Sequence, residues 1–240
     1  MQQKMPMKIK NWKLALLAVC FITFLTSLGF WQLARAKQKT LLLRSFAERI
    51  QHPPLTSSDL NQQKERDLRF YRASLSGHFD NQHTLLLDNK IYQRQVGYEV
   101  FTPFMADGLS TPILIDRGFI PMGDSRDHLP VIQAITGQVT LVGLLNLPPA
   151  YVALGQATEL SSTHWPLRVE FINLTTLSPF LAFQPFHYLL SLDPKNPAAY
   201  ALEWKIVSVG PERHLGYAVQ WFALALTLLI ISIVLNHRQT

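Results

Sequence analysis

The chain has 240 residues, a formal net charge of +6 and an isoelectric point near 9.5. Eight of its 22 basic residues flank two long apolar segments without any acidic companion, while residues 41–213 hold the other 14 and all 16 acidic residues. This distribution excludes a general nucleic-acid-binding surface and instead indicates anchorage at anionic lipid headgroups, which makes the membrane lipid bilayer the first expected partner.

The first predicted element is a transmembrane helix over residues 14–34, after an N-terminal segment of residues 1–13. These 21 residues carry no formal charge. As a helix they span about 31 Å, which matches a hydrocarbon core of roughly 30 Å. The run is longer than the roughly 7–15 apolar residues of a signal peptide. Bulky Phe30 and Trp31 also stand where a cleavage site would need small residues, so we expect an uncleaved anchor. No Arg- and Ser-rich transit peptide precedes it, which favours a bacterial plasma membrane.

Residues 35–54 are expected to continue this helix to about residue 50 and to end at Pro53 and Pro54, which together with residues 56–59 indicate the linker into the folded domain. Residues 55–213 then form a β-rich domain, because short apolar runs alternate there with turn residues. The expected strands are 68–75, 84–87, 98–101, 113–115, 139–145, 167–172, 187–192 and 204–209, with one helix at 175–183. Seven or eight short strands predict a mainly antiparallel, α+β domain that closes into a β-sandwich or a partial barrel.

The last predicted element is a second transmembrane helix over residues 214–236, followed by a C-terminal segment of residues 237–240. Two spans place both termini on the same side of the membrane. The positive-inside rule does not select that side, because four basic residues precede the first helix and four follow it. The single cysteine, Cys20, lies in the first span, so the domain has no disulfide and no cysteine-based metal site.

Signatures of catalysis are absent from the sequence, including the serine-hydrolase, zinc-protease and phosphate-loop motifs. Asp88, Asp116 and Arg117 are expected at strand ends, where they could line a polar site of an anchored periplasmic enzyme. The interpretation we favour is that they hold adjacent loops in place.

One candidate site lies where the second span begins. His214, Tyr217 and Trp221 are spaced i, i+3, i+7 and therefore share a helix face. Gln220 is an amide inside a membrane span, where an unsatisfied polar group is costly. The end of the first span carries Trp31 and Gln32, which a two-helix hairpin brings to the same side of the bilayer. An imidazole with arginine and aromatic neighbours could bind haem through iron, a propionate and the ring faces. The alternative is an ordinary aromatic belt at the headgroup level.

Several motifs follow one another in a recognisable order. Residues 28–39 read LGFWQLARAKQK and residues 214–222 read HLGYAVQWF; between them lie GHFD at 77–80, DN at 88–89, GYEV at 97–100 and DRGFIP at 116–121. Together they resemble the Surfeit locus protein 1 family over nearly the whole chain. Phe119 stands where that family commonly has Trp, and Lys90 where it often has Arg.

The resemblance implies an assembly factor for cytochrome c oxidase rather than an enzyme. It implies residence in the bacterial inner membrane, with both termini in the cytoplasm and residues 55–213 in the periplasm. The implied partners are cytochrome c oxidase subunit 1 and other oxidase assembly factors. The implied cofactor is haem a, bound transiently, with His214 as the iron ligand. The other residues expected to hold it are Arg213, Tyr217, Gln220, Trp221, Trp31 and Gln32. The alternative function is a haem-independent scaffold whose Gln32 and Gln220 grip an oxidase subunit during assembly.

Overall fold

The computed structural model describes residues 12–62, 66–123, 128–151 and 164–238. The chain divides into two compact units. One is a helix pair, made of the residues up to Arg44 and those from Ile206 onward; the other is a sheet domain, Ser45–Lys205. Each unit is described by itself.

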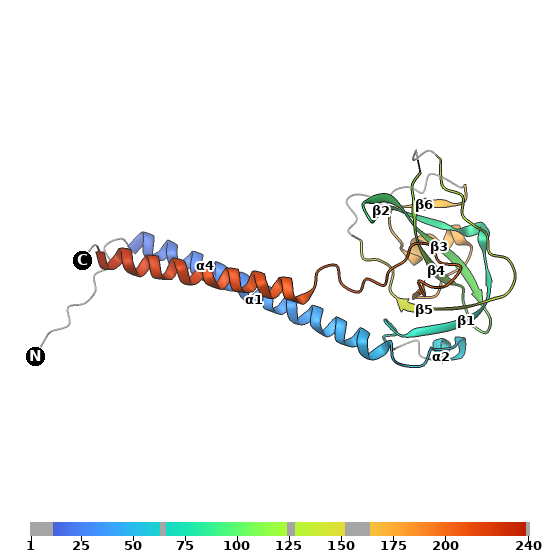
Figure 1. Ribbon diagram of the computed structural model, residues 1–240, viewed down its shortest axis with the longest axis horizontal. Helices are drawn as coiled ribbons and strands as arrows, with labels where there is room; N and C mark the ends of the chain where they lie inside the picture. Colours follow the sequence, from blue (N-terminus) through green and yellow to red (C-terminus); the bar gives the residue numbers. More distant parts are fainter. Residues whose placement is uncertain (1–11, 63–65, 124–127, 152–163, 239–240) are drawn as a thin grey trace, which may run out of the picture. The chain divides into compact units, whose positions relative to one another are not determined.

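The helix pair consists of α1 (Trp12–Arg49) and α4 (Pro211–Arg238), both long and apolar enough to cross a membrane. They lie side by side in opposite directions (Figure 1). Most of their large apolar side chains are exposed, as for Phe24 (57%) and Leu226 (57%). Exposure of this extent is expected where lipid, rather than protein, covers a helix. The predicted membrane protein with a helix near each end is confirmed, and α1 continues beyond its apolar run as expected.

The sheet domain is built on one seven-stranded sheet. Its strands are β1 (Arg72–Phe79), β2 (Leu85–Tyr92), β3 (Gln95–Ala106), β4 (Ile113–Pro121), β5 (Val139–Asn146), β6 (Leu167–Val169) and β7 (Leu189–Leu192). The order is β1-β5-β7-β4-β3-β2-β6, and β3 also pairs with β1. That additional pairing joins five strands into a ring from which β2 and β6 extend (Figure 1). Of the two predicted architectures, the partial barrel is therefore the one formed.

The interior of the ring is apolar. Leu75, Phe104, Ile113 and Leu190 are fully buried in its core cluster. A second cluster lies under α3 (Leu174–Leu181), which begins where Asn173 Oδ1 accepts hydrogen bonds from the backbone N–H groups of residues 175 and 176. The helix predicted at 175–183 is thus confirmed. Two further short elements are α2 (Ser57–Gln62) and the 3₁₀ helix η1 (Asn81–His83).

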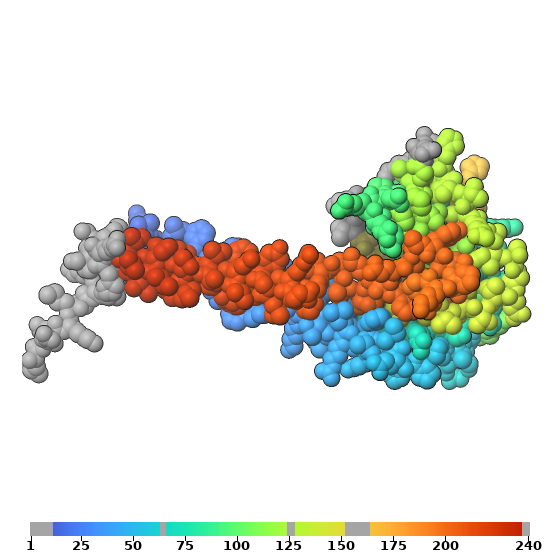
Figure 2. Space-filling view, in the orientation of Figure 1, coloured from blue at the N-terminus to red at the C-terminus, as the bar shows by residue number. Residues whose placement is uncertain are grey.

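Three predictions about the domain were wrong. Residues 204–209 form no strand, because the segment after β7 lies across β4 instead of extending the sheet; it is the orange segment on the near face of the domain in Figure 2. Backbone hydrogen bonds from Tyr200 N to Arg117 O (2.6 Å) and from Phe119 N to Ala201 O (2.8 Å) hold it there. The first strand begins at Arg72 rather than residue 68, because residues 68–71 make a turn with Phe70 at φ +68°. Residue 57 begins α2 instead of belonging to a linker.

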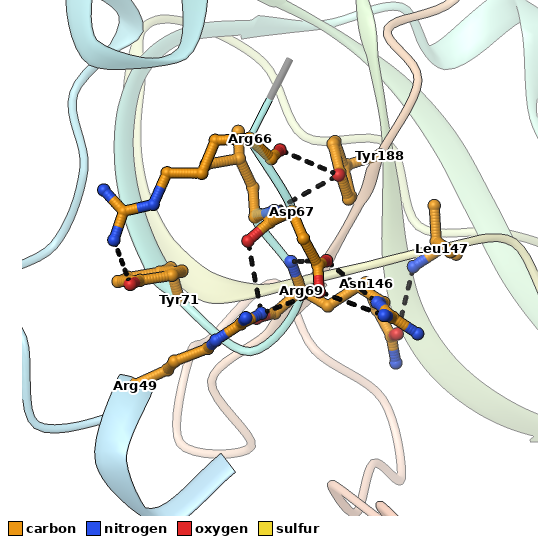
Figure 3. Close-up of polar contacts among 9 residues, drawn as sticks. Arg49, Arg66, Asp67, Arg69, Tyr71, Asn146, Leu147 and Tyr188 are labelled. Carbon is orange, nitrogen blue, oxygen red and sulfur yellow. Dashed lines mark hydrogen bonds and ion pairs between the residues drawn. The ribbon is translucent and has the colours of Figure 1, made fainter. Parts of the chain in front are cut away.

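The C-terminal end of α1 is tied to the domain by Arg49, which belongs to the same unit as the sheet. Its Nη1 donates to Asp67 Oδ2 (3.1 Å) and to the carbonyl oxygens of Asp67 (3.2 Å) and Arg69 (2.8 Å) (Figure 3). Its guanidinium also lies 5.4 Å from the centre of the Tyr71 ring, which Arg66 contacts as well. Asp67 in turn accepts from the Arg69 side chain, and these hydrogen bonds hold the pKa of Asp67 well below its usual range.

Candidate functional site

The candidate site is part of the contact between α1 and α4, which we call the seam. Its members recur every three or four residues: Ala18, Ile22, Leu25, Gly29, Gln32 and Ala36 on α1, and His214, Ala218, Trp221, Ala225, Leu228 and Ser232 on α4. This alternation is the spacing of helices that pack side by side at a small angle. The small members let the helices approach closely. A Cβ on Gly29 would lie 2.6 Å from the Phe222 ring, so only glycine fits there without displacing that ring.

His214 and Gln32 form the polar contact of the seam. His214 Nδ1 lies 2.8 Å from Gln32 Oε1. A carbonyl oxygen can only accept, so Nδ1 carries the proton and donates it to Gln32. The neutral imidazole then has its lone pair on Nε2, the nitrogen that remains for a metal ligand. The hydrogen bond thus sets both the tautomer of His214 and the orientation of its ring.

The remaining predicted site residues take different positions around the pair. Trp221 is half-buried in the seam, two turns along α4 from His214. Tyr217 (51%) and Trp31 (51%) are exposed, and the Trp31 ring lies 5.6 Å from the Arg35 guanidinium. Arg213 and Gln220 are exposed as well. The fold therefore brings His214 and Gln32 into contact, keeps Trp221 in the seam, and leaves the other four predicted site residues on the outside of the helices.

Comparison with known proteins identifies the family. The model of the SURF1 family matches residues 19–226. This chain belongs to the SURF1 family. It is 25% identical to a SURF1-like protein of Rickettsia prowazekii over 94% of this chain and 90% of that protein. It is 22% identical to a SURF1-like protein of Monosiga brevicollis (93% and 87%) and 28% identical to Surfeit locus protein 1 of Xenopus tropicalis (90% and 72%).

The two terminal motifs by which the sequence resembles the SURF1 family meet in the seam. Gly29 packs on Phe222, Gln32 bonds to His214, and the rings of Phe30 and Phe222 lie 5.3 Å apart in an edge-to-face contact. Residues 182 positions apart in the chain are thus joined in one place. The contact of Gly29 with Phe222 was not predicted, although the regular spacing of Gly29, Ala36, Ala218 and Ala225 was a readable signal for it.

The second set of candidates lies inside the domain of this SURF1-family chain. Asp88 lies within β2 and Asp116 and Arg117 within β4, so the prediction that they stand at strand ends was wrong; long pairing with β3 continues β4 to Pro121. Arg117 is buried and donates to the carbonyl oxygens of Ala198 (3.0 Å) and Gln133 (3.1 Å). Its role in holding neighbouring segments in place is confirmed.

Asp116 is buried beside Arg117 but does not pair with it. Its carboxyl group accepts from the backbone N–H of Gly118 (3.0 Å) and bonds to the Ser191 hydroxyl. Burial, reinforced by the nearby charge of Glu99, raises the pKa of Asp116 to about 7. Asp88 Oδ1 likewise accepts from a backbone N–H, that of Asn89, at 2.6 Å. Asp88, Asp116 and Arg117 thus all form hydrogen bonds with nearby backbone groups.

Across the described parts of the chain, no three His, Cys, Asp or Glu side chains gather into a metal site. A bare metal ion usually needs three or four protein ligands. A haem iron needs only an axial one, because the porphyrin supplies the rest. In the helix pair, the single oriented imidazole of His214 therefore suits a haem iron better than a bare metal ion.

Proposed function

We propose that this chain is an assembly factor for cytochrome c oxidase that assists delivery or insertion of haem a into subunit 1. It acts in the bacterial inner membrane without being a catalyst. Its termini lie in the cytoplasm and its sheet domain in the periplasm, where it meets subunit 1 and other oxidase assembly factors. The observation that carries the proposal is the hydrogen bond from His214 Nδ1 to Gln32 Oε1, which leaves Nε2 for an iron atom.

The groups around His214 suit a haem. Arg213 precedes it on α4 and is exposed, as a partner for a propionate must be. The rings of Tyr217, Trp221 and Trp31 provide apolar faces for the macrocycle. The haem itself supplies the redox-active iron when bound. The chain contributes one imidazole ligand, a charge partner and an apolar surface, which suits temporary holding.

The test is an absorption spectrum of the full-length protein, purified in detergent from cells that also make haem a. The parent is expected to carry a haem a band, and His214→Ala is expected to lose it. Gln32→Leu keeps the imidazole but removes its orienting hydrogen bond. It should therefore retain haem a with about 10- to 100-fold weaker affinity, the usual effect of losing such a partner.

His78→Ala is the matched control, since His78 is an exposed histidine of β1 that belongs to the domain. It should keep the haem band of the parent. A haem-free parent in cells that make haem a, or a His214→Ala variant with its haem content intact, would contradict the assignment.

A second function is favoured by the same hydrogen bond. Between two membrane helices such a bond also serves as a purely structural link. The chain would then be a scaffold that stabilises an assembly intermediate of an oxidase subunit without touching haem. Gln32 is engaged by His214, which leaves Gln220 as the amide available for gripping a subunit. This scaffold predicts co-purification with subunit 1 from cells that cannot make haem a, whereas the haem carrier predicts that this complex is lost.

A further inference from the structure

The outer face of α4 carries a row of small and polar residues. Gly216, Gln220, Ala223 and Thr227 follow one another at intervals of four, three and four, so they lie along one side of the helix. All four are exposed, and a Cβ added to Gly216 would meet nothing within 4 Å. We call this row the outer stripe. At 100° per residue it stands opposite the seam members Ala218 and Ala225.

Within the helix pair, α1 contacts the opposite side of α4, where Ala218 and Ala225 are buried. A helix surface that faces only lipid has no need of an amide. The outer stripe nevertheless contains an amide, that of Gln220.

Gln220 is the residue that a lipid-facing position explains least. It is the sixth residue of the apolar run that begins at residue 215, so it lies about 8 Å along the helix axis from the start of that run. Its amide has two donor hydrogens and an acceptor oxygen, and among the described residues it makes no hydrogen bond. A polar group left unsatisfied in hydrocarbon is costly, and such groups usually face another helix.

Four hydroxyl groups of the two spans have local partners. The hydroxyl groups of Thr23 and Ser27 bond to carbonyl oxygens of their own helix, and those of Thr227 and Ser232 do the same. Gln32 is satisfied by His214. Gln220 lies on the side of α4 opposite α1, so a polar group of a neighbouring molecule can satisfy its amide.

We propose that the outer stripe is a dimer interface, and that it binds the outer stripe of a second copy of this chain. An amide is complementary to itself, because the N–H of one Gln220 can donate to the carbonyl oxygen of the other and accept the reciprocal bond. A two-fold axis along the membrane normal brings Gln220 of both copies together at the same depth. Gly216 and Ala223, one turn to either side, allow the backbones to approach closely enough for that bond. Another membrane protein would have to supply a complementary polar group at that depth, whereas a second copy always does.

The test uses the full-length protein in lipid vesicles, with Cys20 replaced by Ser. A cysteine is placed either on the stripe (Ala223→Cys) or at the next residue, 100° around the helix (Leu224→Cys), where the native side chain is 52% exposed. Mild oxidation should join two copies through residue 223 and leave residue 224 monomeric. Adding Gln220→Leu to the Ala223→Cys protein should weaken association about 3- to 20-fold, while Gln220→Asn should restore part of it.

Each outcome bears on the dimer. Equal cross-linking at residues 223 and 224, or none at residue 223, overturns it, and so does cross-linking at residue 223 that Gln220→Leu leaves unchanged. A cross-link from residue 223 to a different polypeptide overturns the second copy as occupant. Gln220→Leu makes the span more apolar and should insert normally, which its resistance to alkaline extraction from the vesicles verifies. The experiment needs neither haem nor oxidase, so its failure leaves the proposed function unaffected.

Discussion

Among single residues, Asp116 has the least favourable surroundings for a charge. It is buried in β4, the negative charge of Glu99 also acts on it, and the hydrogen bonds from Gly118 and Ser191 only partly offset both effects. The folded domain therefore keeps a proton on Asp116 up to a pH of about 7, whereas the unfolded chain releases it near the ordinary value of 3.8. Asp116 consequently opposes folding as the pH rises.

The stability of the domain is therefore expected to fall as the pH rises, and this fall should be smaller in Asp116→Asn. Between about pH 4 and pH 7 only the folded state retains this proton, so the free energy of unfolding falls with rising pH by up to about 1.4 kcal/mol per unit. Above pH 7 both states are ionised and the loss is complete. Asparagine imitates the protonated carboxyl, because it can accept from Gly118 and donate to Ser191. The unfolding midpoint of the detergent-solubilised full chain should therefore decline less between pH 4.5 and pH 8 in Asp116→Asn than in the parent.

Asp107→Asn controls for the change in net charge, because Asp107 is an exposed carboxylate of the same domain. If the parent and Asp116→Asn lose stability equally over this range, the raised pKa does not exist.

Residue types and spacing predicted part of the candidate site. The motifs around Gln32 and His214 indicated that both lie at the same end of a two-helix hairpin, and they are in hydrogen-bond contact. The sequence could not show that Tyr217 and Gln220 turn away from the partner helix, because an apolar span looks alike on its lipid and protein sides. The site roles of the seven residues remain predictions.

At the scale of elements, apolar runs predicted most of the strands but not how they join. The apolar runs near residues 85, 113 and 139 were readable, since many of the side chains there are large, apolar and buried. Closure of the ring depends on three residue pairs between β1 and β3, such as Gly77 with Ala106. A Cβ on Gly77 would lie 2.0 Å from the Met105 carbonyl oxygen, so this close approach requires glycine. No local sequence pattern predicts such a contact between two strands that are distant in the chain.

The C-terminal end of α1 is attached to the turn before β1 largely through one side chain, that of Arg49. Arg49 makes three hydrogen bonds to the turn before β1 and packs on Tyr71. The rings of Phe46 and Phe70 add an edge-to-face contact at 5.8 Å. A planar guanidinium can reach several acceptors at once, which a lysine ammonium on a flexible stem does less well.

Arg49→Ala should therefore lower the stability of the sheet domain by about 1–3 kcal/mol, because it removes hydrogen bonds to a carboxylate and to two backbone carbonyls. Arg49→Lys should recover less than half of that loss. The measurement is the unfolding midpoint of the full-length protein in detergent. Lys195→Ala, which removes an exposed cation of the same domain, should stay within about 0.5 kcal/mol of the parent. An Arg49→Ala variant as stable as the Lys195→Ala control would show that the apolar contacts alone hold the helix end.

For the whole molecule, the number of membrane spans decides whether the chain ends and the sheet domain lie on the same side of the membrane. Both α1 and α4 are long and apolar enough to cross the bilayer. If both cross it, the two ends of the chain lie on one side and the sheet domain on the other. The charges flanking the spans leave the direction open, with four basic residues on each side of the first span. Family resemblance is the ground for placing the domain in the periplasm.

Cysteine labelling in intact cells tests this direction. In a Cys20→Ser protein, a cysteine at exposed position 78 of β1 should react with a membrane-impermeant maleimide added to the periplasmic side, whereas a cysteine added after Thr240 should react only once the inner membrane is opened. A short outer-membrane permeabilisation gives the reagent access, and a cytoplasmic thiol protein that stays unlabelled shows that the inner membrane is intact. The reverse pattern would place the sheet domain in the cytoplasm, on the wrong side for a periplasmic assembly factor. Labelling of both positions in intact cells would mean that one of the two helices does not span the membrane. Only labelling at position 78 with protection of the C-terminus agrees with two spans and the proposed orientation.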